Sequence, residues 1–193
     1  GADLNDGNGN NAGHARVYGL TTTAPQISGT PSVYVTSGAV YSFIPTATDA
    51  EGDSLSFSVA NLPSWAFVNA ATGAITGTPA ANDAGTTTGI VVTVSDGTLT
   101  ADLSSFDITV LLDTDGAGDP DSCDANCQSA GYTEDTDDDG DGLTDAQEAQ
   151  LGTDPLDADS DDDGLTDDVE SQSSTDPLDA DSDDDGVNDG NDA

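Results

Sequence analysis

The sequence predicts a mainly β protein, with an immunoglobulin/cadherin-like Greek-key β-sandwich followed by an acidic repeat array with short helices. Two observations lead to this fold class. Short apolar runs separated by turn residues fill residues 24–112, and an acidic frame recurs every 22 residues from Asp137. We therefore expect four segments: a leader at 1–23, the sandwich at 24–112, a connector at 113–136 and the repeats at 137–193.

The charge balance limits the partners that the chain can have. Its 193 residues include 39 Asp or Glu and one Lys or Arg, for a net charge of −38. Self-repulsion of this size opposes a compact fold, so we expect bound cations. Nucleic acid and anionic lipid are excluded as partners because both need clusters of Lys and Arg. We also expect no membrane insertion, since no apolar run approaches the roughly 20 residues of a membrane span.

The leader at 1–23 is rich in Asn, Gly and Asp, and its only large aliphatic residues in a short candidate strand are Val17 and Leu20. Gly1 does not open a basic and then apolar signal segment. We therefore expect a processed chain whose leader is a linker or an assembly segment.

The sandwich is predicted from alternation of apolar and polar residues. Leu55, Phe57 and Val59 alternate with serines, and the run from Phe106 to Val110 has the same pattern. Such alternation is typical of strands with one buried face. Further β-type runs are PSVYVTSG, AVYSFIPTATD, GAITGTP and GIVVTVSDG, so we expect a single sandwich.

This stretch resembles the immunoglobulin or dystroglycan-type cadherin-like family of bacteria. The resemblance is carried by ISGTP at Ile27, YSF at Tyr41, TDAEGDSLSFSV at Thr48, LPSW at Leu62, ATGAITGTP at Ala71 and VTVSDGT at Val92. It implies a Greek-key sandwich that serves as a spacer or adhesive module, with Trp65 in the core. The alternative is an exposed Trp65 that stacks on glycans.

An acidic turn interrupts the sandwich at Asp49, Glu51 and Asp53, with Asp96 as a further candidate. The alternating carboxylates could converge on a cation, or the segment could be a solvated turn at the start of a strand. Both interpretations stay open from the sequence.

The repeats carry the most specific pattern. Asp137, Asp139 and Asp141 stand at positions 1, 3 and 5 of a loop with Gly142 at 6, Asp145 at 9 and Glu148 at 12. This is the spacing of an EF-hand calcium loop, in which position 7 offers its backbone carbonyl and position 12 two oxygens. Leu143 stands at position 7 of this loop and is a ligand candidate through its carbonyl. The same frame returns twice, which gives the further ligand candidates Asp159, Asp161, Asp163, Leu165, Asp167, Glu170, Asp181, Asp183, Asp185, Val187, Asp189 and Asp192.

Short helices are expected after the first two loops. Thr144 and Thr166 are placed to cap them, Gln147 completes a capping box, and Gly152 suits the end of the first helix. We expect the apolar residue at position 7 to pack inward and Asp138 to point outward. A second calcium ion between repeats is expected from Asp154, Asp157, Asp176 and Asp179.

The array from Asp137 to Ala193 resembles bacterial thrombospondin type 3 repeats, because DPLDADSDDDG occurs twice in frame. The resemblance implies an irregular rod wound around several Ca²⁺ ions. The third copy departs from the pattern with Asp192, rather than Glu, at position 12. A disordered acidic tail is the alternative, but three copies in frame argue against it.

The connector holds Cys123 and Cys127, four residues apart. A disulfide is favoured over free thiols, and also over a zinc site, because no His lies nearby. It would agree with an oxidising, extracellular setting. The acidic residues of the connector form an imperfect calcium loop, which predicts a cation-assisted junction at Asp113, Asp115, Asp119 and Asp121.

These features predict a secreted or cell-surface structural or adhesive protein that binds calcium and is not an enzyme. The chain has no lysine, and its one histidine, His14, lies in the leader. We expect protomers to join head to tail into a fibre. The alternative is a module that binds carbohydrates or surfaces on a stalk rigidified by calcium.

Overall fold

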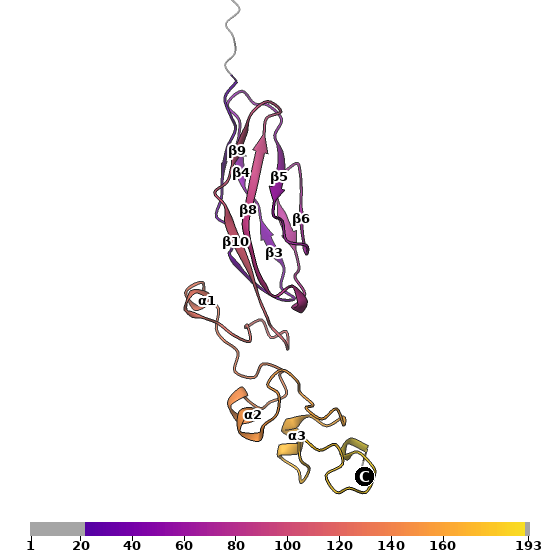
Figure 1. The fold of residues 1–193 in the computed structure, drawn as a ribbon. Helices are drawn as coiled ribbons and strands as arrows, with labels where there is room; N and C mark the ends of the chain where they lie inside the picture. Colours follow the sequence, from indigo (N-terminus) through magenta and orange to yellow (C-terminus); the bar gives the residue numbers. More distant parts are fainter. Residues whose placement is uncertain (1–21, 192–193) are drawn as a thin grey trace, which may run out of the picture.

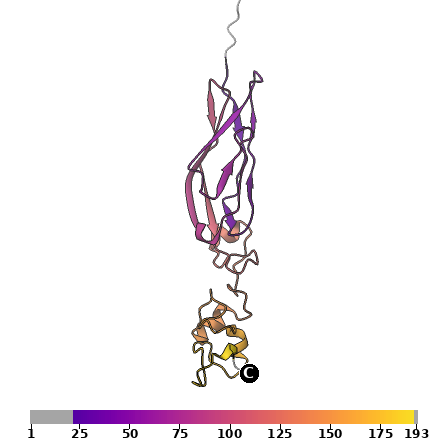
Figure 2. The same ribbon diagram turned by 90° about the vertical axis from the view of Figure 1, so that its right-hand side faces the viewer.

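The computed structural model describes residues 22–191. In it a long β-sandwich leads through a connector into a compact acidic repeat array (Figures 1 and 2). The predicted leader strand with Val17 and Leu20, His14 and the candidate ligand Asp192 lie outside the described residues.

The sandwich is built from ten strands, which confirms the mainly β fold class. The larger sheet has the order β2-β10-β8-β5, with β9 also paired to β8, and the smaller sheet has the order β3-β7-β6. A separate antiparallel ladder joins β1 and β4, and β2 runs parallel to β10. The strands are β1 (Gln26–Ser28), β2 (Tyr34–Thr36), β3 (Tyr41–Phe43), β4 (Thr46–Thr48), β5 (Ser56–Ala60), β6 (Ala66–Val68), β7 (Ile75–Gly77), β8 (Gly85–Ser95), β9 (Thr100–Asp102) and β10 (Phe106–Leu111).

The alternating residues face the core as predicted. In β5, Phe57 and Val59 are half-buried while the serines between them are exposed, and in β10 Ile108 and Val110 are buried. The core cluster consists of Val35, Tyr41, Phe43, Ala66, Ile75, Ile90, Val92, Ile108 and Val110.

Trp65 packs against this core. Its ring lies edge-on to Tyr41 with the ring centroids 5.8 Å apart, and a Cβ at Gly77 would collide with the backbone and ring of Trp65. Glycine at this position therefore lets β7 pass close beneath Trp65. Trp65 is half-buried against the core as predicted, and this packing favours a structural role over stacking on a glycan.

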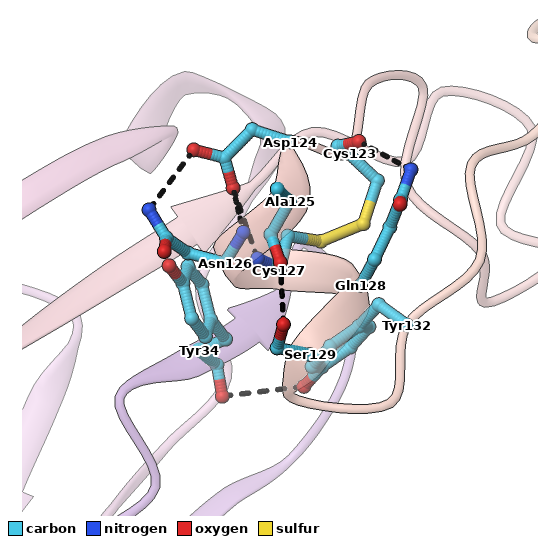
Figure 3. Close-up of a disulfide and its surroundings, with 9 residues drawn as sticks. All are labelled: Tyr34, Cys123, Asp124, Ala125, Asn126, Cys127, Gln128, Ser129 and Tyr132. Carbon is cyan, nitrogen blue, oxygen red and sulfur yellow. Dashed lines mark hydrogen bonds between the residues drawn. A yellow bond between two sulfur atoms is a disulfide. The ribbon is translucent and has the colours of Figure 1, made fainter.

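The connector follows β10 and lies at the end of the sandwich that is nearer to the repeats (Figure 1). Its short helix α1 (Ala125–Ser129) contains Cys127, which forms the predicted disulfide with Cys123 (Figure 3). The Tyr132 hydroxyl donates a hydrogen bond to the carbonyl of Tyr34 in β2 at 3.2 Å, and the two rings pack edge-on. The connector is thus held to the sandwich by a backbone acceptor and an aromatic contact.

The repeats contain α2 (Asp145–Leu151), α3 (Asp167–Ser171) and a 3-10 turn at Asp189–Asn191. A second 3-10 turn, at Ala81–Asp83, lies in the sandwich between β7 and β8. The predicted capping box of α2 is present, because Gln147 Oε1 accepts hydrogen bonds from the backbone and hydroxyl of Thr144. Gly152 ends α2 in the left-handed conformation, with φ of 91°.

Candidate metal centres

Each of the three loops gathers the carboxylates at positions 1, 3 and 5. In each loop one oxygen from each of the three residues lies within 4.8 Å of the others. The groups are Asp137, Asp139 and Asp141; Asp159, Asp161 and Asp163; and Asp181, Asp183 and Asp185.

Backbone hydrogen bonds curl each loop around its first carboxylate. The N–H groups of Asp163 and Gly164 donate to the two carboxylate oxygens of Asp159, at 3.1 Å and 2.9 Å. Gly164 has φ of 102°, in the left-handed region that favours glycine at position 6. The third loop repeats both bonds to Asp181. The local sequence therefore forms a concave, acidic loop before any ion is considered.

The position-12 carboxylates are buried without hydrogen-bond partners. Glu148 is 0% exposed and Glu170 is 1% exposed, and neither oxygen of either side chain accepts a hydrogen bond. One oxygen each of Asp139 and Asp161 is unpaired in the same way. A buried charge without a partner is costly, which favours either protonation of these carboxylates or a bound cation.

The electrostatics of the loops reflect this crowding. Burial, followed by repulsion from Asp139 and Asp141, raises the pKa of Glu148 to about 7. Burial and repulsion from Asp161 and Asp163 raise the pKa of Glu170 to about 7. Without a cation, both carboxylates are therefore held in an environment that disfavours their charge.

Position 9 connects each loop to the preceding one. We expected Asp189 to serve the third loop, but one of its oxygens lies with Asp163 and Glu170 of the second loop. Asp167 likewise repels Glu148 of the first loop enough to raise its pKa. The position-9 carboxylates also accept the backbone N–H of position 2 in their own loops, so they stand between successive sites.

The third loop is the most open. Asp183 and Asp185 are exposed, and Val187 is 41% exposed, whereas Leu143 of the first loop is buried. Inward packing at position 7 is therefore wrong for Val187. Within the described residues it is followed only by the short 3-10 turn at Asp189–Asn191, in place of the α-helix that follows the first two loops.

The predicted second calcium site between repeats is not assembled. The carboxylates of Asp154 and Asp176 accept the backbone N–H groups of Leu156 and Leu178, as turn caps. Neither these two residues nor Asp157 and Asp179 belong to a group of three converging carboxylates in residues 22–191.

The carboxylates of the acidic turn in the sandwich, like those of Asp154 and Asp176, accept backbone hydrogen bonds from nearby residues. Asp49 Oδ1 accepts the N–H groups of Glu51 and Asp53, and Asp96 Oδ1 accepts those of Thr98 and Leu99. The second carboxylate oxygens of Asp49 and Asp96 are buried and unpaired, but no three carboxylates converge here. This geometry favours the turn over a cation site.

Sequence reasoning misplaced Asp138. We expected it to point outward, but it is 8% exposed and its Oδ1 is buried without a partner. Burial, followed by repulsion from Asp145, Asp121, Asp135 and Glu134, raises its pKa to about 7. The connector, which packs beside the first loop, causes this burial. The available signal in the sequence was that position 2 is Ser in the other two loops.

The geometry defines a class of protein in which an Ig-like β-sandwich precedes an array of acidic loops. Residues 21–111 match the family described as "Putative Ig domain", and residues 137–158 and 159–180 each match the family described as "Bacterial TSP3 repeat". The chain thus contains an Ig domain followed by two bacterial TSP3 repeats, and both predicted resemblances are confirmed. The third loop, from Asp181, falls outside these matches. No curated protein matches the chain.

Several solved structures match part of the chain. The SrpA adhesin of Streptococcus sanguinis is 14% identical with a TM-score of 0.42, and the match covers 69% of this chain and 75% of the adhesin. Human protocadherin-24 EC1-2 is 19% identical with a TM-score of 0.35, covering 47% of this chain and 44% of that one. The endo-fucoidan hydrolase MfFcnA4 is 28% identical with a TM-score of 0.39, and this chain spans 14% of its length. These TM-scores are too low to bear on function.

None of the helices in residues 22–191 is long and apolar enough to cross a membrane.

Proposed function

We propose that the chain is a calcium-binding structural or adhesive protein of the cell exterior, in which calcium gives the repeats their fold. The observation that carries this proposal is the pair of fully buried, unpaired carboxylates, Glu148 and Glu170. Each lies close to the position-3 and position-5 carboxylates of its own loop, and calcium takes six to eight oxygens of this kind. In the described residues no Lys or Arg is available to neutralise them, because the single basic residue is Arg16.

The site supplies binding rather than reaction chemistry. The carboxylates would surround an ion and replace the apolar core that the repeats lack, so metal binding would supply folding free energy. Calorimetric titration of the chelator-treated protein with Ca²⁺ tests this directly. Saturable binding accompanied by compaction of the repeats supports the proposal, and absence of binding at millimolar Ca²⁺ would refute it.

We further propose that protomers assemble head to tail into a fibre. The elongated arrangement in Figure 1 supports this, because the first and last described residues lie at opposite ends of the molecule. A contact between two different surfaces that does not close into a ring propagates as a filament. Electron microscopy in millimolar Ca²⁺ should show fibres for the full chain. Removal of residues 1–23 should abolish them while leaving calcium binding intact, whereas fibres from the truncated chain would contradict the leader's role.

A surface-binding role for the sandwich is the rival. Phe67 on the edge strand β6 is 72% exposed, and Val40 and Ile44 beside β3 are also exposed. Exposed aromatic and aliphatic groups on one sheet favour a contact surface for a glycan or another protein. Glycan-array binding that is lost in Phe67→Ser, with fibre formation unchanged, would favour this role over assembly.

A further inference from the structure

An exposed apolar groove lies between α2 and α3 of the repeats. Its volume is about 240 Å³, and the residues that line it are Leu143, Gln147, Gln150, Leu151 and Ser171. Leu143 is buried, whereas Leu151 at the end of α2 is 43% exposed. The repeats thus leave apolar surface open to solvent beside two of their helices (Figure 1).

Leu178 of the second repeat extends this apolar surface. A Cβ at Gly152, which follows Leu151 in the chain, would lie 3.6 Å from Leu178 Cδ1. Leu178 is itself 51% exposed. Leucine side chains that gather in water, within an otherwise acidic array, favour a partner that covers them.

Two exposed carboxylates stand close to the groove along the chain. Asp154 comes two residues after Gly152, and Asp176 comes two residues before Leu178. Each uses Oδ1 to accept one backbone N–H, from Leu156 and Leu178 respectively. Neither carboxylate belongs to a converging group in residues 22–191. Both can therefore pair with a cationic side chain without competing for a loop's ion.

The leader has the complementary chemistry. Arg16 is the single basic side chain in a chain with 39 acidic residues, and it is followed closely by Val17, Tyr18 and Leu20. A cation next to apolar side chains matches an apolar groove that has carboxylates beside it. No other segment of the sequence contains Lys or Arg, so no other segment has this complementarity.

The leader cannot reach the groove of its own chain. The first described residue and the repeats lie at opposite ends of the molecule (Figure 1). A fully extended chain places residue 16 at most about 22 Å from residue 22. Strand β8 alone spans 11 residues along the sandwich, or about 35 Å, and the groove lies beyond the sandwich. A leader in the groove therefore belongs to a second copy.

We propose that residues 16–20 of one protomer dock into the groove formed by Leu143, Leu151 and Leu178 in the next protomer. The apolar leader residues cover the exposed leucines, and Arg16 pairs with the carboxylates beside the groove. The inference rests on the proposed head-to-tail fibre and identifies the two surfaces that meet in it.

Zero-length cross-linking tests the contact. The chain has no lysine, so Arg16→Lys introduces one side-chain amine and keeps the charge. A carbodiimide, which joins an amine to a carboxylate in direct contact, is applied in millimolar Ca²⁺ to a mixture of isotope-labelled and unlabelled Arg16→Lys protein. Mass spectrometry should find the introduced lysine joined to Asp154 or Asp176, with one labelled and one unlabelled partner. The wild type is the control, because it has no side-chain amine.

A matched pair of leucine variants tests the groove in the full chain. Leu151→Ser removes a lining side chain, and sedimentation should show assembly only at about tenfold higher protein concentration. Leu156→Ser is the control, since Leu156 is similarly exposed at 46% but does not line the groove. It should assemble as the wild type does. Equal assembly of the two variants would overturn the proposal.

The outcomes distinguish this contact from the fibre itself. A wild type that stays monomeric in millimolar Ca²⁺ would overturn both. Fibres in which the introduced lysine forms no cross-link, or joins only carboxylates of the sandwich, the connector or the three loops, would overturn the groove contact alone.

Discussion

The backbone N–H of Gly190 donates a hydrogen bond to Asp163 Oδ2 at 2.8 Å, across 27 residues of sequence. The same contact joins the preceding pair of loops, where the N–H of Asp168 donates to Asp141 Oδ2 at 2.9 Å. In both cases the carboxylate belongs to position 5 of one loop and the N–H to position 10 of the next. Successive loops are therefore joined through the same residues that form the candidate metal sites.

This contact leaves no room for a side chain at Gly190. A Cβ there would overlap the carbonyl oxygen of Asp163, so Gly190→Ala should push the third loop away from the second. Because Asp189 faces the second site, we expect weaker Ca²⁺ binding at that site and little change at the first. Calorimetric titration checks this, with the exposed Asp184→Asn as control. Identical isotherms for Gly190→Ala and the wild type would refute the coupling.

Glu148→Gln and Glu170→Gln should each weaken one calcium site. Each change removes the charge of a fully buried carboxylate, and such ligands normally supply two oxygens. We expect affinity at that site to fall by at least the roughly 10–100-fold that changes beside metal sites cause. Asp162→Asn removes an exposed charge at a position with φ of 60°, which Asn tolerates, so it should cost little. Equal affinities for all three variants would contradict the assigned loop frame.

Chelation should unfold the repeats and spare the sandwich. The sandwich has its own apolar core, whereas buried residues in the repeats are largely carboxylates. Small-angle scattering should show expansion after treatment with a chelator, and proteolysis should then cut within 137–191 but not within the strands. Addition of Ca²⁺ should reverse both changes. Unchanged scattering and protease resistance would argue against folding driven by metal.

The stability of the metal-free repeats should depend on pH. The pKa of Glu148 and of Glu170 is raised to about 7 from an ordinary value of 4.5, so the folded state binds more protons between these limits. Stability without calcium should therefore fall as pH rises from about 4.5 to 7. Calcium affinity should rise over the same window, because the ion competes with those protons.

Small-angle scattering of the chelated protein at pH 5 and pH 7.5 measures the first trend, as more compact repeats at pH 5, and titration at both values measures the second. The double variant Glu148→Gln, Glu170→Gln should weaken both trends, and Asp138, whose pKa is also raised to about 7, should account for the remainder. A metal-free protein that becomes more stable at pH 7.5 than at pH 5 would have the opposite sign and would exclude this account.

The sequence predicted the parts of the site that depend on neighbours along the chain. Alternating Asp residues and Gly164 curl one loop by local hydrogen bonds, so positions 1, 3 and 5 converge as the spacing indicates. The contribution of Asp189 to the site of Asp163 was not predictable from the loop arithmetic, because it depends on how one repeat stacks on the next.

The strands, too, were predicted where the local pattern is clear and missed where it is not. Strands with clear alternation, such as β5 and β10, were predicted, whereas β6 and β9 lie outside the β-type runs of the sequence. Asp138 was placed outward because position 2 of an isolated loop faces solvent. Its surroundings include connector residues such as Asp121 and Asp135, which lie outside the loop frame.

The contact between position 5 of one loop and position 10 of the next also has a mechanical consequence. A molecule pulled from its two ends would load these contacts in series, since each loop is joined to its neighbour along the chain. Release of one 22-residue loop would add contour length of about 3.3–3.6 Å per residue, on the order of 70–80 Å. The array would then lengthen stepwise under tension and recoil when the loops regain their ions, while the sandwich stays folded.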